Sequence, residues 1–149
     1  MPMPKSVTKI KKDGIEFISS VDRANYTIRE LTRAALKDVA KLLRKRMIEE
    51  LKKLPGMKRH RRIYNSTQYW ARKQECDLQV GVKHDSWYGV NQELGTKGMP
   101  KKGIVRETTF KHIDDIRRIE GQYLSAIEDE NKALGLIDEE EEIGDEEST

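Results

Sequence analysis

The chain has 149 residues and a formal net charge of +3; 36% of the residues are hydrophobic and 37% are charged, which corresponds to one domain with a modest core. No stretch approaches the roughly 18 consecutive apolar residues of a membrane-spanning helix, and no apolar run follows the first basic residues, so neither a membrane span nor a signal peptide is predicted. Cys76 is the only cysteine, which excludes an internal disulfide and favours a soluble intracellular protein.

The N-terminal residues predict a flexible arm followed by a short strand. Residues 1–13 contain two prolines and lack a hydrophobic period, so we expect a flexible arm there. In residues 14–20, Ile15 and Phe17 occupy alternate positions, which is typical of a strand. Asp22 follows, and we expect its carboxylate to accept a backbone N–H at the start of a helix.

A long amphipathic helix is predicted from Arg23 to about Leu54. Apolar residues recur at steps of three and four positions on one face, namely Ile28, Leu31, Ala35, Val39, Leu42, Leu43, Met47 and Leu51. Pro55 and Gly56 end the pattern. At ~1.5 Å per residue, such a helix is about 45 Å long. This length is large for a small domain, so the helix must lie across a sheet or extend to a neighbouring subunit.

A β-hairpin is predicted after a basic loop over residues 57–66. Side chains alternate in Thr67–Lys73 and again in Asp77–Lys83, and three residues join the two runs. A period of two on both sides of a short connection is typical of an antiparallel hairpin with one solvent-facing side.

The stretch after the hairpin predicts a short helix from Tyr88 to Thr96. Gly95 is expected to end it as a C-cap, because glycine tolerates a positive φ. Val90 and Leu94, together with Tyr88, are expected to pack against the sheet. The residues from 97 to 103 then form an exposed basic loop.

The remaining residues predict a C-terminal helix from about Val105 to Leu134, with an apolar stripe at helical spacing. The expected fold is α+β: a small antiparallel sheet of three to four strands packed against the long N-terminal helix and the C-terminal helix. We expect one such two-layer domain over residues 14–135. Residues 138–149 contain eight acidic side chains and no basic ones, so a disordered acidic tail is predicted over residues 136–149.

No catalytic, metal or cofactor site is predicted. The three histidines, His60, His84 and His112, lie in different segments and lack the spacing of metal ligands. Acidic residues flank Cys76 on both sides and disfavour the thiolate that a nucleophile needs. We therefore expect neither enzymatic activity nor a cofactor.

Two non-catalytic functions remain open. Between Arg33 and Lys73 there are fourteen basic residues against three acidic ones, and aromatic residues follow the basic loop. Such a surface neutralises phosphates without sequence specificity, which favours a small basic DNA-binding accessory protein of a mobile element. The second function is self-assembly, because a long helix and a small sheet with open edges favour head-to-tail contacts that close into a ring.

The order of features from Asp77 to Asp129 resembles the neck or tail-completion proteins of long-tailed phages and prophages. In that family, a strand is followed by an aromatic residue, a short helix that ends in Glu-aliphatic-Gly-Thr, a proline and a long helix. The positions that match this motif are Tyr88, Glu93, Leu94, Gly95, Thr96 and Pro100. The chain lacks the Arg-Thr-Gly turn and the Arg-Pro-Phe segment of many members, so neither is carried over.

The resemblance implies a structural virion protein for head–tail joining or tail completion, without catalysis or a cofactor. It further implies a homo-oligomeric ring at the neck, contacts with other neck or tail proteins, no membrane contact, and a location in the virion and, during assembly, in the host cytoplasm. The residues that we expect to face a neighbouring subunit or the DNA in the conduit are Lys58, Arg59, Arg61, Arg62, Lys97, Lys101 and Lys102. The DNA-binding accessory protein is the alternative.

The acidic tail is interpreted first as a solubilising terminus, and the separation of charge along the chain adds the hypothesis that this tail or the acidic helix faces screen the basic surface of the channel. Removing the eight acids of residues 138–149 changes the formal net charge from +3 to +11. The truncated chain is therefore expected to be retained on immobilised DNA at low salt more strongly than the full chain. Equal retention of the two chains would contradict the screening role.

Overall fold

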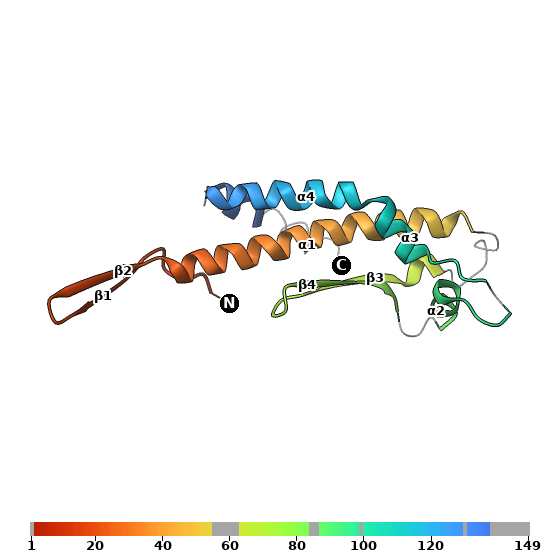
Figure 1. Cartoon of the computed structure of the whole chain (residues 1–149), viewed down its shortest axis with the longest axis horizontal. Helices are drawn as coiled ribbons and strands as arrows, with labels where there is room; N and C mark the ends of the chain where they lie inside the picture. The colour runs from red at the N-terminus through yellow and green to blue at the C-terminus, as the bar shows by residue number, and fades with distance from the viewer. Residues whose placement is uncertain (1, 55–62, 84–86, 99, 130, 138–149) are drawn as a thin grey trace.

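One long helix runs through the computed structural model, which describes residues 2–54, 63–83, 87–98, 100–129 and 131–137 (Figure 1). In chain order the elements are β1 (Thr8–Lys12), β2 (Ile15–Ser19), α1 (Val21–Lys52), the 3-10 turn η1 (Ile63–Ser66), β3 (Thr67–Arg72), β4 (Asp77–Val82), α2 (Trp87–Leu94), α3 (Ile104–Lys111), α4 (Ile113–Ser125) and the 3-10 turn η2 (Ala126–Glu128), followed by a helical stretch over residues 131–137. The predicted α+β class is confirmed.

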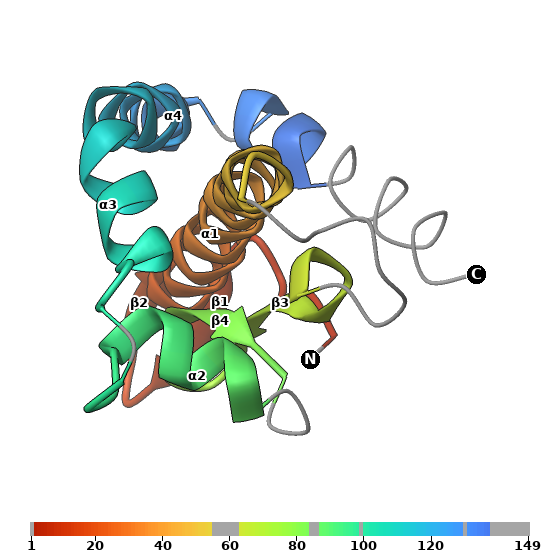
Figure 2. The same ribbon diagram turned by 90° about the vertical axis from the view of Figure 1, so that its right-hand side faces the viewer.

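Helix α1 is the middle layer of the fold. Figure 2, which looks along α1, shows α4 on one side of this helix and the β3–β4 hairpin on the opposite side. Helix α3 lies between these two levels and brings the chain up from the level of α2 to that of α4 (Figure 2). Both outer layers therefore pack on the same helix, which separates the sheet from α4.

The predicted long helix is confirmed, and its apolar stripe forms most of the core. The buried residues of α1 are Thr27, Leu31, Ala34, Ala35, Val39, Ala40, Leu43, Met47 and Leu51. Ser20 is the N-cap of α1, whereas the sequence predicted Asp22 at this position. Asp22 instead lies in the first turn, where a carboxylate is favoured by the positive end of the helix dipole.

The four strands form two separate two-stranded antiparallel sheets, whereas one sheet of three to four strands was expected. The first sheet also corrects the prediction of an arm over residues 1–13, because Thr8–Lys12 form strand β1 and pair with β2. Asp13 and Gly14 have φ angles of 53° and 82°. Two consecutive positive φ angles define the tight type I′ loop that joins two strands, and Asp-Gly is a favoured sequence for it.

The second sheet is the predicted β3–β4 hairpin. Its register runs from Thr67 opposite Val82 to Arg72 opposite Asp77. The guanidinium of Arg72 binds the Asp77 carboxylate beside the turn, and this hydrogen-bonded pair lowers the pKa of Asp77 below its ordinary value. Cys76 has a φ of 51° within the turn. The hairpin is thus closed by a turn and an ion pair at the same end.

The predicted C-terminal helix is broken into shorter pieces. His112 separates α3 from α4 with a φ of −108°, and its ring Nδ1 lies 2.9 Å from the carbonyl oxygen of Thr108. The hydroxyl of Thr109 donates to the carbonyl oxygen of Val105 over 2.8 Å. Side chains that bond to backbone groups of the preceding turn bend or interrupt helices, which an apolar period does not reveal.

The acidic tail was predicted to begin at residue 136, but residues 136 and 137 belong to the core. Ile137 is 6% exposed and clusters with Leu31 and Tyr123, and Leu136 packs against this cluster. Residues 138–149 lie outside the described residues.

A partly buried hydrogen bond joins the two long helices. The hydroxyl of Tyr123 on α4 donates a hydrogen bond to Oδ2 of Asp38 on α1, over 2.7 Å. The ring of Tyr123 is buried in the apolar cluster, so its position is set by packing and by this hydrogen bond. The pair therefore fixes the alignment of α4 along α1.

Replacing Tyr123 by phenylalanine is expected to lower the free energy of unfolding by about 1.5–3 kcal/mol, because the carboxylate of Asp38 loses a donor in a partly buried place. Urea denaturation measures this difference. Tyr69→Phe is the matched control and is expected to change stability by less than about 0.5 kcal/mol. Equal effects of the two substitutions would contradict the role of the hydrogen bond.

Candidate interface site

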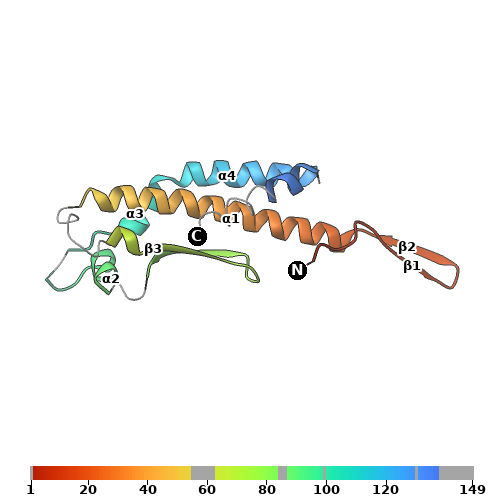
Figure 3. The ribbon, with the colours of Figure 1, turned by 180° about the vertical axis from the view of Figure 1, so that it is seen from behind.

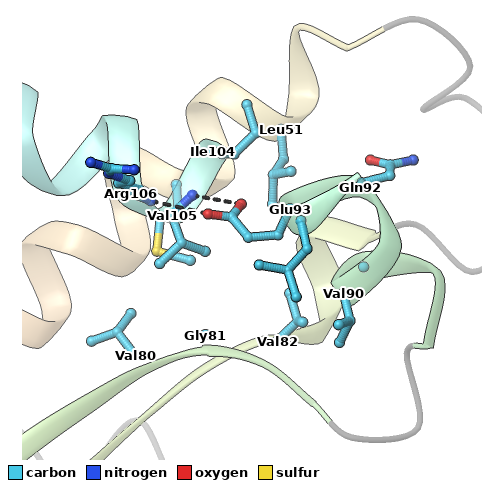
Figure 4. A pocket seen from close by; sticks show the side chains of 13 residues that line it. Leu51, Val80, Gly81, Val82, Val90, Gln92, Glu93, Ile104, Val105 and Arg106 are labelled. Atoms are coloured by element: carbon cyan, nitrogen blue, oxygen red, sulfur yellow. Dashed lines mark hydrogen bonds between the residues drawn. The ribbon is translucent and has the colours of Figure 1, made fainter. Parts of the chain in front are cut away.

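The candidate site is an apolar pocket of about 350 Å³ where α1, β4, α2 and α3 meet (Figure 4). Val80 and Val82 of β4 lie on one side of it, and Val90 of α2 and Val105 of α3 point into it from other elements. The remaining lining residues are Met47, Leu51, Gly81, Gly89, Gln92, Glu93, Leu94, Ile104 and Arg106.

Helix α2 approaches β4 through a glycine. Gly89 is buried, and a Cβ atom placed on it would lie 3.1 Å from Cγ2 of Val82. The sequence predicted instead that Val90 and Leu94 pack against the sheet, together with Tyr88. Leu94 is 67% exposed and Val90 is exposed at the pocket, which corrects that expectation. The side chain of Tyr88 lies outside the described residues.

Glu93 caps helix α3 from a distance in the sequence. Its Oε2 accepts a hydrogen bond from the N–H of Val105 over 3.0 Å, and its Oε1 accepts one from the N–H of Arg106 over 3.2 Å. The N-cap residue of α3 is Gly103, which has no side chain that could accept a hydrogen bond from these amides. The carboxylate of Glu93 therefore satisfies two of the amides that every helix start leaves unpaired.

The loop between α2 and α3 is held at both ends. The backbone N–H of Lys102 donates to the carbonyl oxygen of Gln92 over 2.9 Å, and the backbone N–H of Gly103 donates to the carbonyl oxygen of Glu93 over 3.2 Å. Gly95 has a φ of 80°, and a Cβ on it would lie 2.8 Å from the backbone nitrogen of Lys101. Both the left-handed conformation and the close approach require glycine here. The prediction of Gly95 as the end of α2 is confirmed.

The loop presents basic side chains beside the pocket. Lys97 and Lys101 are exposed and Lys102 is half-buried; among the described residues none of the three forms an ion pair. Arg106 lies over the ring of Phe110, 5.7 Å from its centroid. Both oxygens of Glu93, the carboxylate in the pocket lining, accept hydrogen bonds from backbone amides. The rim of the pocket is therefore basic.

Some of the other predicted site residues lie in the loop between α2 and α3, and the rest lie outside the described residues. Thr96 and Pro100 are exposed in the same loop, and of the motif residues Glu93 and Leu94 line the pocket. Lys58, Arg59, Arg61 and Arg62 lie outside the described residues.

Two polar features at or near the site have no counterpart in the sequence analysis. Among the described residues, Oε1 of Gln92 is buried and has no hydrogen-bond partner, and the amide points away from Val80 and Val82 (Figure 4). On α1, Oε1 of Glu50 lies 2.9 Å from Nζ of Lys53 and 3.5 Å from Nζ of Lys111. These ammonium groups lower the pKa of Glu50 below its ordinary value, and the second contact joins α3 to α1.

The chemistry of this arrangement is that of binding. Apolar side chains dominate the lining, and its two charged members, Glu93 and Arg106, contact backbone amides and an aromatic ring. Nowhere in the described part of the chain do three His, Cys, Asp or Glu side chains gather as a metal site would require. The pocket can accept an apolar side chain of a partner, while the rim attracts negative charge.

Comparisons with protein-family models, with curated proteins and with solved structures each find no match to this chain. None of the helices in the described residues combines the length and the apolar character needed to cross a lipid bilayer.

Replacing Glu93 by alanine is expected to lower the free energy of unfolding by about 1–3 kcal/mol, because two amides of α3 lose their acceptor. Urea denaturation measures the loss. Glu107→Ala is the matched control, since it removes an acid from the first turn of the same helix and is expected to cost about 0.3–1 kcal/mol. A smaller effect at position 93 than at 107 would contradict the cap.

Proposed function

We propose that this chain is a structural virion protein of a tailed phage or prophage, which acts in head–tail joining or tail completion by assembling as a ring at the neck. The observation that carries the proposal is the geometry of the Glu93–Thr96 motif. Its glutamate caps α3 and its glycine admits Lys101, so the motif builds a fixed basic loop beside an apolar pocket.

A fixed loop suits an assembly protein. Side chains that are ordered before contact lose less conformational entropy when a partner binds, which raises affinity without additional contacts. The loop is tied by two backbone hydrogen bonds to Gln92 and Glu93, and the pocket beside it is already open. An apolar centre with a polar rim is the usual composition of a protein–protein contact.

The three loop lysines are the residues that we propose to contact a neighbouring protein of the neck or tail, or the DNA in the conduit. Two bases of α1 have partners within the chain instead. Arg44 donates to the carbonyl oxygen of Thr67 in a partly buried place, and Arg46 forms a surface ion pair with Glu49. These contacts reduce the unpaired basic surface that a dedicated DNA-binding protein would need, and this favours the structural role over the DNA-binding alternative.

In this proposal the protein performs no catalysis and uses no cofactor. Its partners are copies of itself and other neck or tail proteins, with non-specific contact to DNA and no membrane contact. It resides in the virion at the neck or tail, and in the host cytoplasm during assembly.

Changing Lys97, Lys101 and Lys102 together to serine is expected to block head–tail joining in the phage or prophage that encodes the chain. Filled heads and separate tails should accumulate, and the infectious titre should fall at least about tenfold, since three contacts of about 0.5 kcal/mol each are lost. Electron microscopy of purified particles and plaque counts measure this. The matched control replaces Lys73, Lys83 and Lys132, which are also exposed, by serine.

If the triple serine variant joins heads to tails normally, the three loop lysines do not lie at the interface. Gold labelling of the chain on wild-type particles tests the class of function independently. Label at the head–tail junction supports the virion protein. A chain that is absent from particles and is retained on DNA as a monomer or dimer would instead identify the DNA-binding accessory protein.

A further inference from the structure

The first hairpin has one apolar face and one polar face. In the β1–β2 register, Ile10 lies opposite Phe17, and Lys12 lies opposite Ile15. Cross-strand partners and alternate residues of a strand share a face, so these four side chains lie together. We call Ile10, Lys12, Ile15 and Phe17 the hairpin face. Its three apolar members are 56%, 73% and 60% exposed for Ile10, Ile15 and Phe17.

The hairpin extends beyond the start of α1 and away from the other layers (Figure 1, and Figure 3 from behind). All residues of β1 are exposed, as are four of the five residues of β2. An isolated two-stranded hairpin has marginal stability in water unless its apolar face is covered. Three large apolar side chains on one small face therefore indicate a surface that another protein covers.

A groove elsewhere on the molecule is large enough to accept a side chain of this face. It lies between α1 and α4, has a volume of about 180 Å³, and includes Leu31, Leu36, Glu120, Leu124 and Ile127 among its lining residues. We call it the α1–α4 groove. An apolar cavity of roughly 150 Å³ binds benzene, so this groove has room for one aromatic ring. Leu124 and Ile127 are exposed along it.

Charge distinguishes this groove from the pocket beside α2. The lining of the α1–α4 groove contains one carboxylate, Glu120, and no basic residue. The pocket beside α2 includes Arg106 and adjoins the basic loop. The hairpin carries Lys12 on its apolar face, whereas Lys9 and Lys11 share the other face with Glu16. The ammonium group on the hairpin face is therefore attracted to the carboxylate of the groove, and the basic loop beside the pocket repels it.

We propose that the hairpin face of one copy docks into the α1–α4 groove of the next copy, with the ring of Phe17 in the groove and Lys12 beside Glu120. The hairpin of a chain points away from its own groove, so the contact joins two molecules (Figures 1 and 3). The two surfaces are different, which makes the contact head-to-tail and lets it repeat around a ring. The inference deepens the proposed function and rests on it only for the closure of that ring.

Cysteine cross-linking between two kinds of chain tests this contact directly. Full-length chains with Cys76→Ser receive either Lys12→Cys or Glu120→Cys, which keeps the ring of Phe17, and the two preparations are oxidised separately and as a mixture at about 1 mM, where contacts of up to millimolar Kd are populated. The mixture is expected to yield a disulfide-linked dimer of one chain of each kind. Ile18→Cys replaces Lys12→Cys in the control, because Ile18 is 58% exposed on the other face of the hairpin.

Three results would overturn the proposal. The first is a mixture without the cross-linked dimer; the second is a dimer that forms as readily with Ile18→Cys. The third is a dimer that forms fully from the Lys12→Cys chain alone, which would indicate pairing of hairpin with hairpin.

Weakened self-association provides the second readout. Phe17→Ser is expected to raise the dissociation constant measured by sedimentation about tenfold to a hundredfold, because an aromatic side chain no longer enters the groove. Ile18→Ser is the matched control and is expected to change it less than about threefold. Circular dichroism checks that both variants retain their helices.

The two proposals fail in different ways. If chains form rings or join heads to tails without the mixed cross-link, the docking contact is wrong and the virion function stands. If the mixed cross-link forms but the chain is absent from particles, the docking contact stands and the virion function is wrong.

Discussion

Everything in this fold depends on the burial of one helix between two layers. The stripe of α1 from Thr27 to Leu51 packs against α4 with its first half and against β4 and α3 with its second half, and the turn of the β3–β4 hairpin lies beside the first half of the helix. Small residues such as Ala34, Ala35 and Ala40 let the neighbouring layers come close to the helix axis. Since the outer layers meet α1 rather than each other, a chain with few hydrophobic residues can still order several elements.

Sequence patterns predicted those elements whose signal is local and periodic. The stripe of α1, the alternation in β3 and β4, and Gly95 at the end of α2 are all of this kind. The β1–β2 hairpin was missed because lysines interrupt the apolar alternation of β1, although Asp13-Gly14 carried a strong turn signal. The break at His112 was missed because the apolar period continues across it.

The site was predictable in its residues but not in their roles. The resemblance singled out Glu93 and Gly95, whereas the partners of Glu93 are amides twelve and thirteen positions later, which no local pattern connects. Gly89 was overlooked because a glycine in a short helix is expected only to lower the stability of that helix. In the structure it is the point where α2 contacts β4. The carboxylate of Glu93, to which the sequence pattern assigned no structural role, is thus part of the scaffold that holds the basic loop.

Because α1 is unbroken, it sets a fixed spacing between the α1–α4 groove and the pocket beside α2. Ala35 lies at the α1–α4 groove and Met47 lies at the pocket beside α2, twelve residues apart on one helix without proline or glycine. That separation corresponds to about 18 Å along the axis and about a third of a turn around it. Whatever occupies the groove is therefore held at a set distance and a set rotation from whatever occupies the pocket.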